Sequence, residues 1–248
     1  MKDQYFGDVN DFRKYGLLRN LVLPTRLRLG VCWMLTGSDG RSDGNFLSYL
    51  HQPERYERCD PDLLRWMRSV VHEERDRRVV RIEGSRVLLD AVFQSEMLTD
   101  DGAQRGRYFA ECQQMFRECD LVFFDPDNGV EIGTVGKGRK NSSKFVFWDE
   151  LQTTFVSGAS VLVYQHFRRV ERTQFIAGLA EEFGRRLDTR SVFSFRTPHV
   201  VFLLAAQARH VEAFRGAMGT IERTWRGEQL GKRPQIVPCE WSVHKATQ

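Results

Sequence analysis

The stretch Asp120-Leu121-Val122-Phe123-Phe124-Asp125-Pro126-Asp127-Asn128-Gly129 decides how the second half of the chain is organised. Its apolar run, residues 121–124, is followed at once by residues that favour turns. This pattern predicts a buried β-strand followed by a loop. Pro126 and Gly129 are explained by the turn itself. The turn does not explain the two acidic residues, because desolvating a charge at the end of a buried strand is costly. We therefore interpret the loop as functional.

Helix and strand patterns alternate after this loop. Apolar or alternating runs predict strands at residues 159–164, 191–195 and 199–205, and helical periodicity predicts helices at 142–156, 171–187 and 211–225. Such alternation is typical of an α/β domain with a mainly parallel sheet and helices on both faces. The last two strands are too close in sequence for a parallel crossover, so we expect an antiparallel pair at one edge of the sheet.

The first half of the chain is less regular. We expect a helix at residues 11–23, a strand at 29–35, and a helix that begins with Asp60 as its cap and Pro61 at its first position. Short strands at 79–82 and 87–89 and a helix at 105–119 complete the prediction. Because no long linker divides the chain, we predict one domain over residues 1–248, with an N-terminal helical extension at about 1–28.

Composition limits the classes of protein that this chain represents. Of the 248 residues, 41% are hydrophobic and 28% are charged, which is typical of a globular protein and excludes a disordered chain. No apolar run approaches the roughly 20 residues of a membrane span, and the first ten residues lack the apolar stretch of a signal peptide. We therefore expect a cytoplasmic protein with no membrane partner. The net charge of +4 is compatible with a nucleic-acid partner.

The five cysteines are scattered and form no CxxC pair, which argues against a disulfide framework or a zinc site. Cys112 and Cys119 lie two helical turns apart, and we interpret them as core residues. The same interpretation applies to Trp33, Phe46 and Tyr49. Two basic residues of the first helix, Lys14 and Arg19, are interpreted as part of its solvated face.

Ligands of open α/β sheets bind beyond the carboxyl ends of the strands, where the loop after Phe124 is expected. Asp125, Asp127 and Asn128 are therefore candidate catalytic residues, and Pro126 is a candidate substrate contact.

The sequence Tyr164-Gln165-His166 ends the next predicted strand, so it should lie beside that loop. His166 is a candidate general base or substrate contact, and Tyr164 is a candidate substrate contact. A purely structural hydrogen bond from His166 to a neighbouring loop is an equal alternative.

Two further loops are candidate binding elements. Residues 36–44 follow the 29–35 strand and are rich in Gly and Asp, although they do not form a GxGxG motif. The candidate cofactor-binding residues in this loop are Gly37, Asp39, Gly40, Asp43 and Gly44. The basic loop at residues 136–144 is either a mobile lid that contacts phosphate or a solvated surface loop, and Lys144 at its end is a candidate substrate contact.

The strand and loop at residues 120–129 resemble the fourth motif of class I S-adenosylmethionine-dependent methyltransferases. Amino-methylating members of that family carry Asp-Pro-Pro-Tyr at this place, whereas Asp127 and Asn128 stand here in place of the second proline and the tyrosine. The later elements are also similar: helix, strand, helix, then an antiparallel pair. The resemblance implies a Rossmann-like fold, S-adenosylmethionine as cofactor, and methyl transfer with nucleic acid as the substrate.

A second resemblance covers about residues 5–204. Over this range the chain is similar to a bacterial family of uncharacterised, methyltransferase-like proteins. The similarity lies in the combination of Phe6-Gly7-Asp8, Lys14-Tyr15-Gly16-Leu17-Leu18-Arg19, Asp43-Gly44, Asp125-Pro126-Asp127-Asn128-Gly129 and Tyr164-Gln165-His166.

Two alternative functions start from the same loop. Asp125 and Asp127 could bind Mg²⁺ or Mn²⁺ in a phosphoryl or glycosyl transferase or a nuclease, with Glu131 and Glu150 as further ligands. The other alternative is a Rossmann-like binding protein without catalysis. Because two adjacent carboxylates repel, we expect their joint replacement by Asn to abolish activity and to leave stability unchanged or slightly raised.

Overall fold

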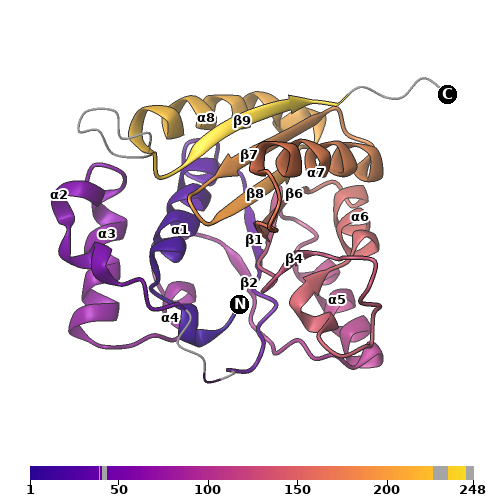
Figure 1. The fold of residues 1–248 in the computed structure, drawn as a ribbon, viewed down its shortest axis with the longest axis horizontal. Coiled ribbons are helices and arrows are strands. Elements are labelled where there is room, and N and C mark those ends of the chain that lie inside the picture. Colours follow the sequence, from indigo (N-terminus) through magenta and orange to yellow (C-terminus); the bar gives the residue numbers. More distant parts are fainter. Residues whose placement is uncertain (39, 41–43, 226–233, 244–248) are drawn as a thin grey trace.

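The computed structural model describes residues 1–38, 40, 44–225 and 234–243 (Figure 1). Within these residues, seven strands form one mixed sheet in the order β2-β1-β3-β6-β8-β7-β9. The strands are β1 (Leu29–Cys32), β2 (Val92–Gln94), β3 (Leu121–Phe124), β6 (Ser160–His166), β7 (Ser191–Arg196), β8 (Val200–Ala205) and β9 (Val237–Ser242). Two short strands, β4 (Gly129–Val130) and β5 (Phe145–Val146), pair with each other.

The centre of the sheet is parallel, as the sequence predicts. Strand β3 pairs in parallel with β1 on one side and with β6 on the other, in a register that aligns Leu121 with Leu29 and with Ser160. Both β1 and β3 are buried along their whole length, because helices cover both faces of the sheet. Strands buried on two faces need continuous apolar runs, which explains the pattern at residues 121–124.

Strands β7 and β8 form the expected antiparallel pair, and β8 also runs antiparallel to β6. The expectation that this pair lies at the sheet edge is wrong, because β9 pairs with β7 on its outer side. The fold is therefore a Rossmann-like α/β fold whose last strands reverse direction.

The helices are α1 (Val9–Val22), α2 (Pro53–Tyr56), α3 (Pro61–Met67), α4 (Val80–Glu83), α5 (Gly102–Met115), α6 (Trp148–Val156), α7 (Arg172–Leu187) and α8 (Val211–Trp225). Helices α1, α3 and α4 lie on one side of the sheet and α5, α6 and α7 on the other (Figure 1). Alternate strand residues supply the two resulting cores: Phe123 belongs to the first and Phe124 to the second. None of the helices described is long and apolar enough to cross a membrane.

Helix α1 is part of the first core. The four apolar residues that the sequence places on one side of this helix are fully buried: Phe12, Tyr15, Leu18 and Leu21. Gly16 allows α1 to approach α8 closely, since a Cβ at this position would lie 2.1 Å from the Trp225 ring. The N-terminal helix is thus packed into the domain, and its polar residues at the sheet end become available to a site.

Several element boundaries differ from the sequence-based expectation. Residues 79–82 were expected to form a strand, but residues 80–82 lie within α4, and the amide of Val79, which precedes the helix, donates to Asp3 Oδ1. The strand expected at 87–89 is absent, and β2 follows it instead at Val92–Gln94. The helix expected from 142 begins only at Trp148, because Phe145–Val146 pairs with β4 and the Phe147 amide donates to Glu150 Oε2.

Candidate active site

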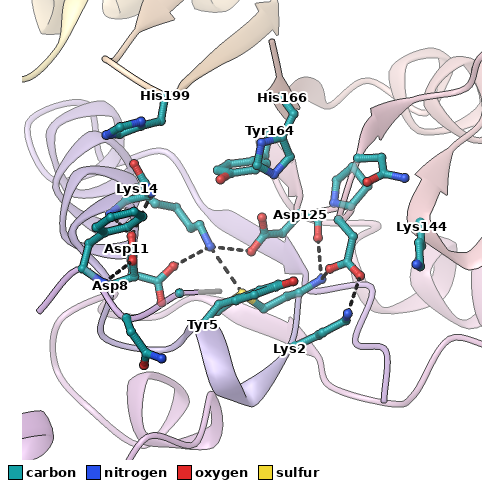
Figure 2. Close-up of a pocket in the computed structure, with 18 residues that line it drawn as sticks. Lys2, Tyr5, Asp8, Asp11, Lys14, Asp125, Lys144, Tyr164, His166 and His199 are labelled. Carbon is teal, nitrogen blue, oxygen red and sulfur yellow. Dashed lines mark hydrogen bonds and ion pairs between the residues drawn. The ribbon is translucent and has the colours of Figure 1, made fainter. Parts of the chain in front are cut away.

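The strand order creates a switch point at the carboxyl ends of β1 and β3. Strand β1 lies between β2 and β3 in the sheet. The chain continues from β1 to β2 on one side and later returns to form β3 on the other side. Ligands of open α/β sheets bind in the crevice at such a point. A cavity of 740 Å³ opens there (Figure 2), lined by Met1, Lys2, Tyr5, Asp8, Asn10, Asp11, Lys14, Gly44, Asn45, Phe46, Asp125, Pro126, Asp127, Asn128, Lys144, Tyr164, His166 and His199.

Lys14 is at the centre of the polar network in this cavity. Its Nζ donates hydrogen bonds to Asp125 Oδ2 at 2.6 Å and to Asp11 Oδ1 at 2.8 Å, and all three residues are buried. Burial alone would lower the pKa of Lys14, but Asp11 and Asp125 outweigh burial and raise it. The two carboxylates therefore favour the charged form of Lys14. The interpretation of Lys14 as a solvated residue is wrong.

Asp127 faces a different set of cations. Its Oδ1 lies 3.0 Å from the Met1 α-ammonium, and its Oδ2 accepts a hydrogen bond from Thr36 Oγ1 at 2.9 Å and lies 3.7 Å from Lys2 Nζ. Burial would raise the pKa of Asp127, but the ammonium group, Thr36 and Lys2 together hold that pKa below its usual value. Asp125 and Asp127 thus each have their own cation, and the repulsion expected from the sequence is compensated.

The crevice between β1 and β3 holds the Met1 residue. Its α-ammonium group donates to the carbonyl oxygens of Asp125, at 2.9 Å, and Met34, at 3.2 Å. Its Sδ lies 3.5 Å from Lys14 Nζ. The carboxyl ends of the two strands therefore present acceptors for an α-ammonium group next to space for a thioether side chain.

The loop after β3 is held in place from β6. Gln165 Oε1 accepts a hydrogen bond from the Val130 amide at 2.9 Å, and its Nε2 donates to the Asn128 carbonyl at 3.2 Å. Gly129 between them has a φ of +109°, and a Cβ there would lie 2.2 Å from Gln165. Gln165 thus positions the loop. No role was expected for Gln165 from the sequence, although its place between Tyr164 and His166 is a signal that the sequence carries.

The structure brings Tyr164 and His166 into the same cavity as Asp125, Asp127 and Asn128, as the order of the strands implies. The His166 ring meets the Tyr164 ring edge-on, with centroids 5.1 Å apart. Loss of hydration lowers the pKa of His166, although the negative charges of Asp125 and Asp127 act in the opposite direction. A neutral imidazole at physiological pH can accept a proton.

Among the described residues of the expected cofactor loop, only Gly44 lines the cavity. A Cβ on Gly44, whose φ is +84°, would lie 2.5 Å from the Tyr5 ring, so this glycine permits a close approach of the N-terminal segment. Gly37 and Gly40 border open space. Asp39 and Asp43 lie outside the described residues.

The basic loop at 136–144 is anchored at its end. Asp100 accepts hydrogen bonds from the Asn141 and Ser143 amides, and Arg105 donates to the Ser142 carbonyl. These contacts fix the segment that leads to Lys144, whose side chain reaches the cavity wall (Figure 2).

The two further carboxylates proposed as metal ligands are engaged elsewhere. Glu150 forms a buried pair with Arg105, with an Oε1 to Nε distance of 2.7 Å, and Glu131 accepts a hydrogen bond from the Trp148 amide. In the part of the chain that the structure describes, no group of three or more His, Cys, Asp or Glu side chains could hold a metal ion. The expectation that Glu131 and Glu150 join Asp125 and Asp127 is therefore wrong.

Two other interpretations of single residues also change. Arg19 is not on a solvated face: its Nε lies 2.7 Å from Asp60 Oδ2 and its Nη1 donates to the Val87 carbonyl. Phe46 is not a core residue, because 61% of its surface is exposed at the cavity, whereas Trp33 and Tyr49 are buried as expected.

Comparison with known proteins adds little to this description. No protein-family model and no curated protein matches the sequence. Among solved structures, the crystal structure of LPL1258 from Legionella pneumophila, assigned to the family model DUF519, is a distant neighbour. It has a TM-score of 0.40 and 11% sequence identity over 97% of this chain and 98% of that chain. A likeness at this level carries no argument about function.

Proposed function

We propose that the protein is an S-adenosylmethionine-dependent methyltransferase that acts on an amino group. One observation carries the proposal: the crevice at the ends of β1 and β3 accepts the α-ammonium and the thioether of a methionine residue, directly beside the Asp125-Pro126 loop. The resemblance of this loop to the methyltransferase motif supports the same conclusion, as does the position of the crevice at the switch point of the sheet.

The acceptors at this crevice fit the α-ammonium group of the cofactor's methionine part. The carbonyl oxygens of Met34 and Asp125 and the carboxylate of Asp127 would hold its ammonium group, as they hold that of Met1. When bound, the cofactor supplies an electrophilic methyl group. Because Met1 uses the same acceptors, cofactor binding would require Met1 to move away from them.

Residues at the cavity would bind and deprotonate the acceptor amine. Asn128 is exposed in the cavity, and its side-chain oxygen can accept a hydrogen bond from the amine and so orient the nitrogen lone pair. The nitrogen gains a bond to carbon as the sulfur–carbon bond breaks, and it must then lose a proton. His166, kept neutral by its lowered pKa, would accept that proton. Asp125, fixed by Lys14, would contribute negative charge near the cationic nitrogen.

Calorimetric titration with S-adenosylmethionine tests the proposal directly. We expect saturable binding to wild-type protein and weaker binding of adenosine, which lacks the methionine part and its ammonium group. Asn128→Ala should leave cofactor binding and the melting temperature unchanged while it lowers methyl transfer. Val156→Ala, at an exposed position on α6, serves as the control.

Absence of both heat and thermal shift at millimolar cofactor would overturn the proposal. The same thermal-shift series should include Mg²⁺ and Mn²⁺. A melting temperature that rises with either metal, but not with S-adenosylmethionine, would favour the metal-dependent alternative.

A further inference from the structure

An exposed aromatic pair lies at the mouth of the cavity. The rings of Phe46 and His199 are nearly parallel, with an interplanar angle of 8° and centroids 5.9 Å apart. Phe46 is 61% exposed, and both residues line the cavity. Two further large rings line this cavity, those of Tyr5 and Tyr164, and the Tyr164 ring lies buried beside Lys14 Nζ at the charged floor.

The backbone on both sides of this pair is fixed. The Phe46 amide donates to Asp8 Oδ2 at 3.0 Å, and its carbonyl accepts from the Val9 amide at 3.2 Å. The His199 amide donates to Thr197 Oγ1 at 3.3 Å. The Phe46 ring is therefore held in contact with water by ordered backbone, and a flat apolar surface presented in this way is suited to stack on a planar ligand.

Hydrogen-bond acceptors lie just inside this aromatic mouth. Asp8, Asn10 and Asp125 line the cavity. Their oxygens already accept hydrogen bonds from the Phe46 amide, Arg13 and Lys14, respectively, but a carboxylate or amide oxygen can accept a second one. A planar heterocycle that carries an amino group complements both features: its ring faces stack, and its N–H groups donate.

The outer rim carries positive charge. Lys144 lines the cavity on the side of the β3 loop. On the other side, Arg172 is exposed at the first position of α7, six residues after His166. Arg172 is close enough to His199 to act on it electrostatically. Cations on either side of an aromatic mouth fit a chain of phosphates that carries planar bases.

We infer that Phe46 and His199 form a stacking platform for one base of a single-stranded nucleic acid, whose phosphates contact Lys144 and Arg172 on the two sides of the cavity. The inference rests on the proposed function in one respect: the amino group of that base would be the methyl acceptor. The binding itself does not depend on the cofactor, so it can be tested without it.

The test uses fluorescein-labelled 12-nucleotide single strands of mixed sequence, as RNA and as DNA, with adenosine monophosphate as a competitor. Binding to the whole protein is followed by fluorescence anisotropy at two salt concentrations, without S-adenosylmethionine. Loss of one stacked base weakens binding by about tenfold, so Phe46→Ala should show this loss, whereas Phe46→Trp should retain binding. Val156→Ala removes an exposed apolar side chain from α6 and should change nothing.

Arg172→Gln should weaken binding and reduce its salt dependence, because it removes a contact to phosphate. His199→Ala provides a second test of the platform should Phe46→Ala lower the melting temperature. Equal binding by wild type, Phe46→Ala and His199→Ala, or no binding of either strand, would overturn the inference. Displacement by the mononucleotide alone at similar affinity would also overturn it, because the rim would then contribute nothing.

These outcomes separate the two proposals. Strand binding that depends on Phe46, in a protein that does not bind S-adenosylmethionine, would support the platform and overturn the methyltransferase. Binding of S-adenosylmethionine without binding of the nucleic acid would support the methyltransferase and overturn the platform.

Discussion

Lys14 Nζ donates a 2.6 Å hydrogen bond to Asp125 Oδ2, although the two residues are 111 positions apart in the sequence. The contact joins α1 to the loop after β3 across the floor of the cavity (Figure 2). Asp11, one helical turn before Lys14, shares the same ammonium group. One buried cation thus compensates two buried carboxylates, and α1 becomes part of the candidate site.

Replacement of this cation should be strongly destabilising. Lys14→Met leaves Asp11 and Asp125 buried without their counter-charge, and removal of one partner from a buried pair costs about 3–5 kcal/mol. Urea unfolding measures the change in the free energy of unfolding. Arg65→Met, which breaks an exposed pair with Asp62, should change it by less than about 1 kcal/mol. Equal small losses in both variants would show that the network contributes little to stability.

Stability should depend on pH through Asp11. Burial outweighs the attraction of Lys14 and raises the pKa of Asp11 from 3.8 to about 6. The folded state therefore holds this proton more tightly than the unfolded chain does. The resulting stabilisation is full below about pH 4 and is lost as the pH rises through about 6, and this difference in pKa corresponds to about 3 kcal/mol at most.

Asp11→Asn cannot titrate and should lack this dependence. The free energy of unfolding of wild type, relative to the variant, should therefore fall between pH 4 and pH 7. Asp127, whose lowered pKa acts in the opposite direction, is common to both proteins and cancels in the difference. Two parallel pH profiles would contradict the assignment.

The contacts in the structure predict that joint replacement of Asp125 and Asp127 lowers stability, which is the opposite of the sequence-based expectation. Each carboxylate has a buried cationic partner, so Asp125→Asn with Asp127→Asn leaves Lys14 and the Met1 ammonium undercompensated. We expect a loss of about 3 kcal/mol and a melting temperature several degrees lower. Asp149→Asn, in an exposed pair with Lys137, is the control. A double variant that melts at or above the wild-type temperature would restore the sequence-based expectation.

The loop after β3 should not tolerate a side chain at Gly129. Gly129→Ala combines a positive φ with a Cβ only 2.2 Å from Gln165. We expect the substitution to lower the free energy of unfolding by about 2 kcal/mol or more and to displace Asn128. Gly133→Ala provides a matched control, because nothing lies within 4 Å of its added Cβ. Thermal melting reports the stability, and methyl transfer reports the loop position. A Gly129 variant as stable as the Gly133 variant would show that the loop is not held by Gln165.

The sequence was most informative where elements are long or bounded by strong signals. The parallel strands β1, β3 and β6 were predicted because residues buried on both faces must be apolar, and Asp60 does cap α3, accepting from the Leu63 amide. The two edge strands of the sheet, β2 and β9, were missed. Neither is buried along its whole length, so neither needs the continuous apolar run that marks β1 and β3.

The sequence by itself determined the order of the helices and main-sheet strands from β3 to α8, and the place of Asp125, Asp127, Asn128, Tyr164 and His166 near one sheet end. These follow from local patterns, since the carboxyl ends of adjacent parallel strands must lie together. Only the tertiary structure decided that Lys14 enters this site and that Phe46 and His199 stack at its mouth. A lysine on a helix and a phenylalanine in a loop carry no local signal of their partners. Their burial or exposure depends on charges and rings supplied from distant parts of the chain.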